Sequence, residues 1–382
     1  MKLFDVYPLL PVTPVSAKGA IVTDENGKEY LDFYGGHAVI SVGHSHPHYV
    51  NKLKSQLDKI AFYSNAVQNP LQVELAEKMG KLSGYETYSL FLCNSGAEAN
   101  ENALKLASFQ NGRKKIIAFE KSFHGRTSAA VAATNDLSIN ANLNLQHEVE
   151  FIPLNDFEIA EKKIDSTVSA VIIEGIQGVA GVIEPTDEFF VFLQKKCEAV
   201  GAILILDEVQ SGCGRTGNFF AHTESGIQPD IITMAKGIGN GFPVGAILIS
   251  PKFTAKHGLL GTTFGGNYLA CAAVISVLEI IEKESLLANA KSIGNYLKEK
   301  LAIIPGVVEV SGKGLMIGIK LEDNCAAVRN QLLKEHFIFT GSASCKKTVR
   351  LLPPLIITLQ QADQFIQSFT TVMQQQTVST LK

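Results

Sequence analysis

The sequence contains no tryptophan, only six cysteines and little net charge. Its net charge of −3 at pH 7 provides no electrostatic basis for binding nucleic acid or an anionic membrane. No apolar run approaches the roughly 20 residues that a membrane-spanning helix requires. The first residues, Met1–Asp5, lack the apolar core of a signal peptide. The cysteines are scattered without a C-x-x-C pair, as in reduced proteins, so we expect a cytoplasmic location.

Aliphatic sequence, by contrast, is abundant. Apolar residues make up 46% of the chain and charged residues 19%, which predicts a large buried core and little disorder. The length of 382 residues suits two domains better than one. We expect a large domain at 46–280 and a smaller domain formed by 1–45 together with 281–382.

Short apolar runs alternate with longer segments between about residues 88 and 250. This alternation predicts an α/β fold in which helices cover both faces of a mostly parallel sheet. The predicted strands are 88–93, 115–119, 169–174, 202–207, 230–234 and 245–249, and helices between them include 97–109 and 187–200. Beyond residue 280 we expect an α+β domain with helices near 284–302, 324–336 and 360–375. Asn26-Gly27 predicts a hairpin within 19–33.

Two of the predicted strands end in chemically useful residues, Asp207 and Lys236. Ligands of open α/β sheets bind at the carboxyl ends of the strands. A lysine can form a Schiff base with the aldehyde of pyridoxal phosphate (PLP), and a carboxylate keeps the pyridine nitrogen protonated. Either residue alone would more often be a loop lysine or a helix cap. The glycines at 239, 241 and 245 favour the functional interpretation, because they allow a tight turn around a bound group.

Three further segments add candidate contacts. Gly96 and Ala97 begin a predicted helix after a strand, where backbone N–H groups can hold a phosphate. Phe123 could stack on an aromatic ring, and Arg126 could bind a substrate carboxylate. A hydroxyl-rich loop at 261–267 offers a second phosphate contact. The alternating histidines in 44–48 fit no common zinc pattern, so we expect a loop with capping groups and no metal site.

These motifs occur in the order found in one family. NSGAEANE, SFHGRT, ILDEVQSGCGRTG, MAKGIGNGFPVGA, TTFGGN and TVRLLPP together resemble the class III aminotransferases, which are PLP enzymes of fold type I. The resemblance covers nearly the whole chain and implies a large domain with a mostly parallel seven-stranded sheet. Among the subgroups, it implies transfer of the terminal amine of N-acetyl- or N-succinylornithine to 2-oxoglutarate, in arginine metabolism.

The resemblance also implies roles for individual residues. Lys236 would form the Schiff base and carry the proton, and Asp207 would pair with the pyridinium nitrogen. The other cofactor contacts would be Gln210 near the ring hydroxyl, Phe123 on the ring, Gly96 and Ala97 at the phosphate, and Thr263 at the phosphate of the neighbouring subunit, which implies a homodimer. Substrate would be held by Arg126, Thr262 and Arg350.

One position departs from the family pattern. The family usually has a glutamate where this chain has Val179, and in ornithine-type enzymes that glutamate masks the carboxylate-binding arginine. Arg350 would therefore stay exposed to substrate unless Glu174 or Glu184 replaces the missing acid. This departure leaves alternatives for the reaction: a donor such as ornithine or 4-aminobutyrate, an aminomutase or racemase on the same fold, or a non-enzymatic module.

Overall fold

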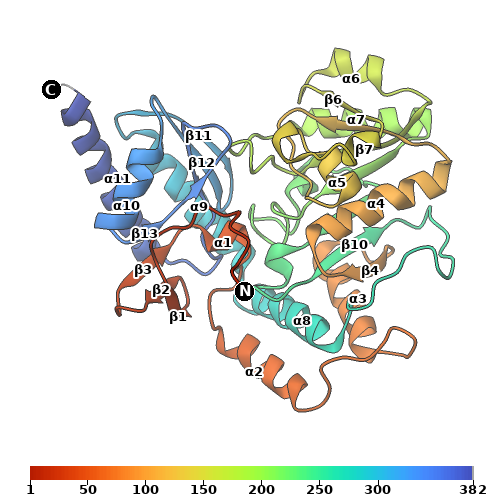
Figure 1. Ribbon diagram of the computed structural model, residues 1–382, viewed down its shortest axis with the longest axis horizontal. Helices are drawn as coiled ribbons and strands as arrows, with labels where there is room; N and C mark the ends of the chain where they lie inside the picture. Colours follow the sequence, from red (N-terminus) through yellow and green to blue (C-terminus); the bar gives the residue numbers. More distant parts are fainter. Residues whose placement is uncertain (381–382) are drawn as a thin grey trace.

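The computed structural model describes residues 1–380, with side chains to residue 376. Its largest element is a seven-stranded sheet (Figure 1), in which β10 pairs antiparallel with both β4 and β9 and the other pairs are parallel. In spatial order the strands are β4 (Ser89–Cys93), β10 (Gly245–Ile249), β9 (Ile231–Met234), β8 (Ile203–Asp207), β7 (Val168–Glu174), β5 (Lys115–Phe119) and β6 (Val149–Ile152). The predicted parallel α/β sheet is confirmed, and β6 is an additional edge strand.

Both faces of this sheet are covered, as predicted. Ala170 and Ile172 of β7 pack in one apolar cluster with residues of α4 (Gly96–Asn111). Val171 and Ile173 point to the other face and join the main core with residues of α7 (Asp187–Val200). Every residue of β7 and β8 is buried, because a strand covered on both faces has no solvent-facing side. The short helices α5 (Ser128–Ala132) and α6 (Phe157–Lys163), and the 3₁₀ turns η1 (Leu137–Ile139), η2 (Asn144–Gln146) and η3 (Ala221–Ser225), lie in the connections.

Two smaller four-stranded sheets complete the fold. One contains β1 (Pro14–Lys18), β2 (Ile21–Asp24), β3 (Glu29–Asp32) and β13 (Ile338–Phe339), and the other β11 (Val307–Lys313), β12 (Met316–Leu321), β15 (Thr348–Leu351) and β14 (Gly341–Ser342). β13 pairs in parallel with β3, so the two ends of the chain share a sheet. Helices α9 (Leu286–Ala302), α10 (Ala326–Glu335) and α11 (Leu359–Thr380) pack with these sheets (Figure 1). The hairpin at Asn26-Gly27 is confirmed by the pairing of β2 with β3.

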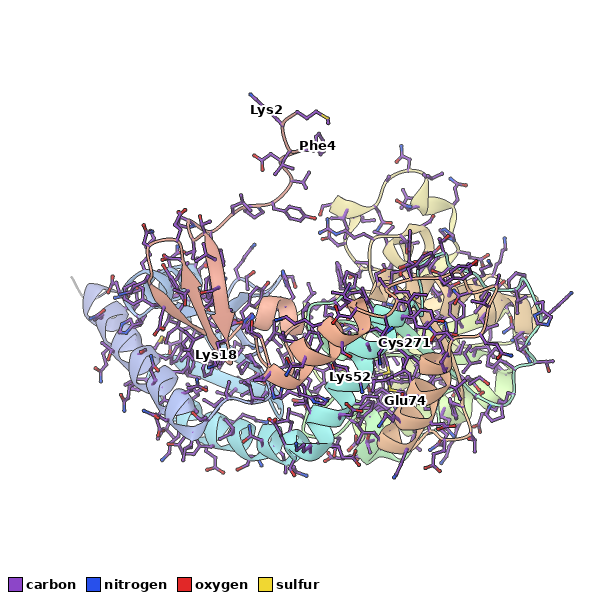
Figure 2. The ribbon with its side chains drawn as sticks, turned by 90° about the horizontal axis from the view of Figure 1, so that it is seen from below. Lys2, Phe4, Lys18, Lys52, Glu74 and Cys271 are labelled. Atoms are coloured by element: carbon purple, nitrogen blue, oxygen red, sulfur yellow. The ribbon has the colours of Figure 1, made fainter. Side chains whose placement is uncertain are left out.

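Helix α8 (Tyr268–Lys283) connects the segment that forms the large sheet to the C-terminal segment that begins with α9. The middle turns of α8 are buried. It packs against α2 (Pro47–Leu57) and α3 (Pro70–Ser83), which follow the short α1 (Gly35–Ala38). Figure 2 shows Lys52 of α2, Glu74 of α3 and Cys271 of α8 in one region of the molecule, and the N-terminal segment with Lys2 and Phe4 projecting from its body. No helix among the described residues could span a bilayer.

The histidines near α2 have protein partners. His46 caps that helix, since its Nδ1 accepts the N–H of His48, as expected for a capping loop. The Nε2 atoms of His46 and His48 lie 2.9 Å from Glu284 Oε1 and 2.7 Å from Glu279 Oε2.

Candidate active site

Three neighbouring strands bring the main polar residues together. Glu174 ends β7 and Asp207 ends β8, and the sheet register places the two residues side by side. Asp207 is likewise level with Thr233 of β9. Two residues beyond the end of β9, Lys236 begins the 3₁₀ turn η4 (Lys236–Ile238) with a φ of 47°. A lysine in this left-handed region is strained, and such strain is frequent at functional sites.

These residues open into a cavity of about 300 Å³, which is large enough for a small ligand. Seven of the predicted site residues line it: Gly96, Ala97, Phe123, Arg126, Asp207, Gln210 and Lys236. Arg350 lies outside this lining, but its Nη1 donates to Gln210 Oε1 at 3.3 Å. Thr262 and Thr263 also lie outside it, on the loop before α8. The structure therefore brings the predicted strand-end residues Asp207 and Lys236 together at one cavity.

Asp207 is held by a buried hydrogen-bond network that the sequence did not reveal. Its Oδ2 accepts from Asn100 Nδ2 at 2.7 Å and lies 2.7 Å from His124 Nδ1, and its Oδ1 accepts from the Val209 N–H at 2.9 Å. Asn100 Oδ1 in turn accepts from the Thr233 hydroxyl at 2.6 Å. His124 Nε2 is buried with no hydrogen-bond partner among the described side chains. The Asp207 carboxylate is thereby fixed in position beneath the cavity.

Burial and neighbouring charges shift the pKa values of Lys236 and Arg350. Burial lowers the pKa of the Lys236 amine, the charge of Arg350 lowers it further, and the carboxylates of Asp207 and Glu174 raise it. A lowered pKa increases the fraction of neutral amine, which is the nucleophilic form. Burial likewise lowers the pKa of the Arg350 guanidinium. The cavity thus contains a buried amine of lowered pKa together with a fixed carboxylate.

The N-terminus of α4 forms another side of the cavity. Ser95 Oγ accepts the N–H of Glu98 at 3.2 Å, and Glu98 Oε2 accepts the N–H of Asn94 at 3.0 Å, an arrangement close to a capping box. The N–H groups of the first helical turn, including those of Gly96 and Ala97, have no partner within the helix. A Cβ at position 96 would approach Val209 Cγ1 to 2.6 Å, so only glycine allows this close packing.

Among the described side chains, no acid pairs with Arg350 in place of the glutamate that the family has at position 179. Arg350 is only 3% exposed and makes no ion pair within 4.0 Å among the described residues. Its Nε donates to Ser342 O at 2.5 Å. Glu174 accepts backbone N–H groups of other loops, and Glu184 accepts the Gly312 N–H at 2.7 Å.

In this conformation, Glu174 and Glu184 therefore hold backbone N–H groups and make no ion pair with Arg350. A Cβ at position 175 would meet Ser211 Oγ at 2.6 Å and both Glu208 carboxylate oxygens at 2.8 Å. The glycine is thus required for close packing. Arg350 keeps only neutral partners, of which the Gln210 amide oxygen is the one that lines the cavity.

The loop at 261–267 is not part of the cavity lining in the single chain. Thr262 Oγ1 accepts from Asn94 Nδ2 and from the Gly265 N–H, each at 3.1 Å, so it helps to hold this loop against the start of α4. Thr263 is exposed and faces solvent in the single chain. Its predicted contact with a neighbouring subunit remains a prediction.

The residues that line the cavity fit PLP. Lys236 can bond to the aldehyde, Asp207 can pair with the ring nitrogen, Phe123 can cover the ring, and the amides of Gly96 and Ala97 can hold the phosphate. This combination on the carboxyl ends of a doubly covered parallel sheet defines a PLP-dependent enzyme of fold type I.

Comparison with known proteins places the chain within that class. The model of the class III aminotransferase family matches residues 6–373. The chain is 40% identical over 368 residues to the acetylornithine aminotransferase of Archaeoglobus fulgidus, covering 96% of both proteins. It is 41% identical over 374 residues to that of Aquifex aeolicus, covering 95% of this chain and 97% of the relative. The chain therefore belongs to the class III aminotransferases and is a PLP-dependent transaminase.

Solved structures agree with this assignment. The ornithine aminotransferase of Toxoplasma gondii superposes with a TM-score of 0.91 at 28% identity, covering 98% of this chain and 93% of that one. The acetylornithine aminotransferase of Elizabethkingia anophelis gives a TM-score of 0.86 at 32% identity, covering 97% and 95%.

Proposed function

We propose that this enzyme transfers the terminal amine of an N-acylornithine, acetyl or succinyl, to 2-oxoglutarate, giving the semialdehyde and glutamate in arginine metabolism. The observation that carries the reaction class is the meeting of Lys236 and Asp207 in one cavity. The choice of donor is supported by near-full-length identity of about 40% to acetylornithine aminotransferases. The structural likeness to an ornithine aminotransferase makes ornithine the main competing donor.

Each of the site residues has a proposed role toward PLP or the donor. Bound PLP supplies an aldehyde that takes the donor amine and a ring that withdraws electrons. We propose that Lys236 holds the cofactor and then moves the proton from the donor carbon. Asp207, fixed by Asn100 and His124, keeps the ring nitrogen protonated. When PLP is bound, Gln210 would contact the ring hydroxyl and Phe123 would cover the ring from one side.

Two arginines are suited to substrate carboxylates. Arg126 is exposed at the cavity edge, and Arg350 is buried behind Gln210. A buried guanidinium without an anionic partner is unfavourable, so a substrate carboxylate would gain a charge-assisted pair there. We propose that both bind substrate carboxylates and that Thr262 contacts the substrate from its loop.

We further propose a homodimer in which Thr263 of each subunit reaches the cofactor phosphate of the other. Its exposed position on the loop before α8 leaves it available for such a contact. The small domain is proposed to comprise 1–45 and 281–382, with PLP bound in 46–280. A cytoplasmic location is proposed from the six free cysteines.

A single-turnover donor panel tests the substrate. Enzyme loaded with PLP is mixed with acetylornithine, succinylornithine, ornithine, 4-aminobutyrate or glutamate, and formation of pyridoxamine phosphate is followed by absorbance. Fastest conversion with an acylornithine is expected. Faster conversion with ornithine or 4-aminobutyrate would reassign the donor, and turnover without a keto acid would indicate a mutase or racemase.

A further inference from the structure

The buried carboxyl of Glu174 connects two loops that line the cavity. Its Oε1 accepts the N–H of Phe123 at 3.0 Å, and its Oε2 accepts the N–H of Gly178 at 3.2 Å. Phe123 lines the cavity after β5, and Val179, next to Gly178, lines it after β7. One side chain therefore sets the spacing between two wall segments that come from different strands.

The second loop packs closely against Gln210. A Cβ at Gly178 would come within 1.8 Å of Gln210 Oε1, the atom that accepts from Arg350. The loops also share a neutral bond, from Gln177 Nε2 to Glu120 O at 3.0 Å. Of the two connections, only the one through Glu174 can gain or lose a proton.

Titratable and charged groups lie around Glu174 on several sides. Asp207 is its register neighbour on β8, His124 follows Phe123 on the first loop, Lys236 stands at η4 and Arg350 on β15. Burial raises the pKa of the Glu174 carboxyl to about 7, with Asp207 adding to the rise and His124 opposing it. Both protonation states are therefore accessible near neutral pH.

We propose that Glu174 is a positioning residue whose carboxylate holds the Phe123 loop and the Gly178–Val179 loop at the cavity, and whose protonation releases one of them. A carboxylate accepts hydrogen bonds at both oxygens, whereas a carboxylic acid turns one oxygen into a donor. The protonated oxygen is a poorer acceptor, and its O–H must turn away from the backbone N–H, so one of the two connections is weakened and its loop is released. The inference concerns the cofactor-free cavity, and only its effect on catalysis rests on the proposed function.

Hydrogen–deuterium exchange of the cofactor-free protein tests this proposal directly. Glu174→Gln keeps the shape but leaves one acceptor oxygen, and Glu184→Gln is the matched control because Glu184 also accepts a backbone N–H, that of Gly312, outside the cavity. At pH 8 we expect about tenfold faster exchange in peptides covering 120–126 or 175–182 in Glu174→Gln, as for loss of one bond to a charged acceptor. Glu184→Gln should change exchange only around Gly312.

The pH dependence supplies the second arm. After correction for intrinsic exchange, the two loops of the wild-type protein should lose protection between pH 8 and pH 6, whereas Glu174→Gln should show no such titration. Unchanged exchange in Glu174→Gln, or a flat wild-type profile, would overturn the proposal. If the Gln variant does not fold, Glu174→Asp replaces it: the titration should persist, with weaker protection of one loop because the side chain is shorter.

A catalytic readout separates this inference from the proposed function. The pH profile of kcat for amine transfer should lose its inflection near neutrality in Glu174→Gln and keep it in Glu184→Gln. Altered loop exchange in a protein that transfers no amine from an acylornithine would reject the proposed function alone. Unaltered exchange in an active transaminase would reject the positioning role alone.

Discussion

Restoring a glutamate at position 179 should redistribute substrate preference. Val179 lines the cavity, and the buried Arg350 has only neutral hydrogen-bond partners among the described residues. In Val179→Glu the new carboxylate can pair with Arg350, and a substrate α-carboxylate must then displace it. A hydrogen bond to a charged group contributes about 1.5–3 kcal/mol. We therefore expect the KM for glutamate to rise by roughly 10- to 100-fold.

The terminal-amine donor should respond in the opposite direction. Such a donor places its carbon chain near Arg350, so a masked arginine should lower or leave unchanged its KM. The assay measures each half-reaction separately by absorbance of the bound cofactor. Val179→Gln introduces a side chain of the same size as glutamate but without its charge. This control should leave both KM values close to those of the wild type. A uniform loss in both half-reactions of the Glu variant would refute the reasoning, because it would indicate crowding and not charge.

Four other outcomes are expected. Lys236→Ala should abolish turnover while still binding PLP through its other contacts, and near-normal steady-state activity would contradict the assignment. Asp207→Asn should keep the cofactor but lower kcat by more than tenfold, or ~1.4 kcal/mol, because an amide cannot hold the ring nitrogen protonated; a smaller loss would make Asp207 a structural residue. Arg126→Ala should raise the KM for carboxylate substrates without lowering the Tm, and an unchanged KM with a lowered Tm would be the contrary result. Because burial raises the pKa of Glu174 from 4.5 to about 7, the folded state binds this proton more tightly than the unfolded state. In the cofactor-free protein, that contribution to the free energy of unfolding should be complete below pH 4.5 and decline by up to ~3 kcal/mol as pH rises to about 7. Chemical unfolding at several pH values checks this, and Glu174→Gln should show a flatter dependence.

The central sheet could be predicted because its strands are almost uniformly aliphatic and end in glycine or polar residues. β7 and β8 are buried along their whole length, which produces a strong signal in sequence. β6 was missed because it is a four-residue edge strand in which three residues are only partly buried. β14 has two residues and depends on its partner β15 for its existence.

The site was predictable to the extent that it lies at strand ends. The placement of Asp207 and Lys236 at one cavity follows from sequence, because parallel neighbouring strands bring their carboxyl ends together. Asn100 and His124 were not found, since their contact with Asp207 depends on how α4 and a loop pack against the sheet. The engagement of Glu174 by two backbone N–H groups also depends on that packing and has no local sequence signal.

The pairing of β3 with β13 has a consequence for synthesis. β3 occupies residues 29–32, and its parallel partner β13 begins at residue 338. A ribosome adding about 5–20 residues per second would need roughly 15–60 seconds to cover the intervening chain. During this interval the hairpin of β2 and β3 has an open edge, which invites pairing with other chains. The large sheet is complete at β10, so it can form first and leave the early hairpin waiting for the last part of the chain.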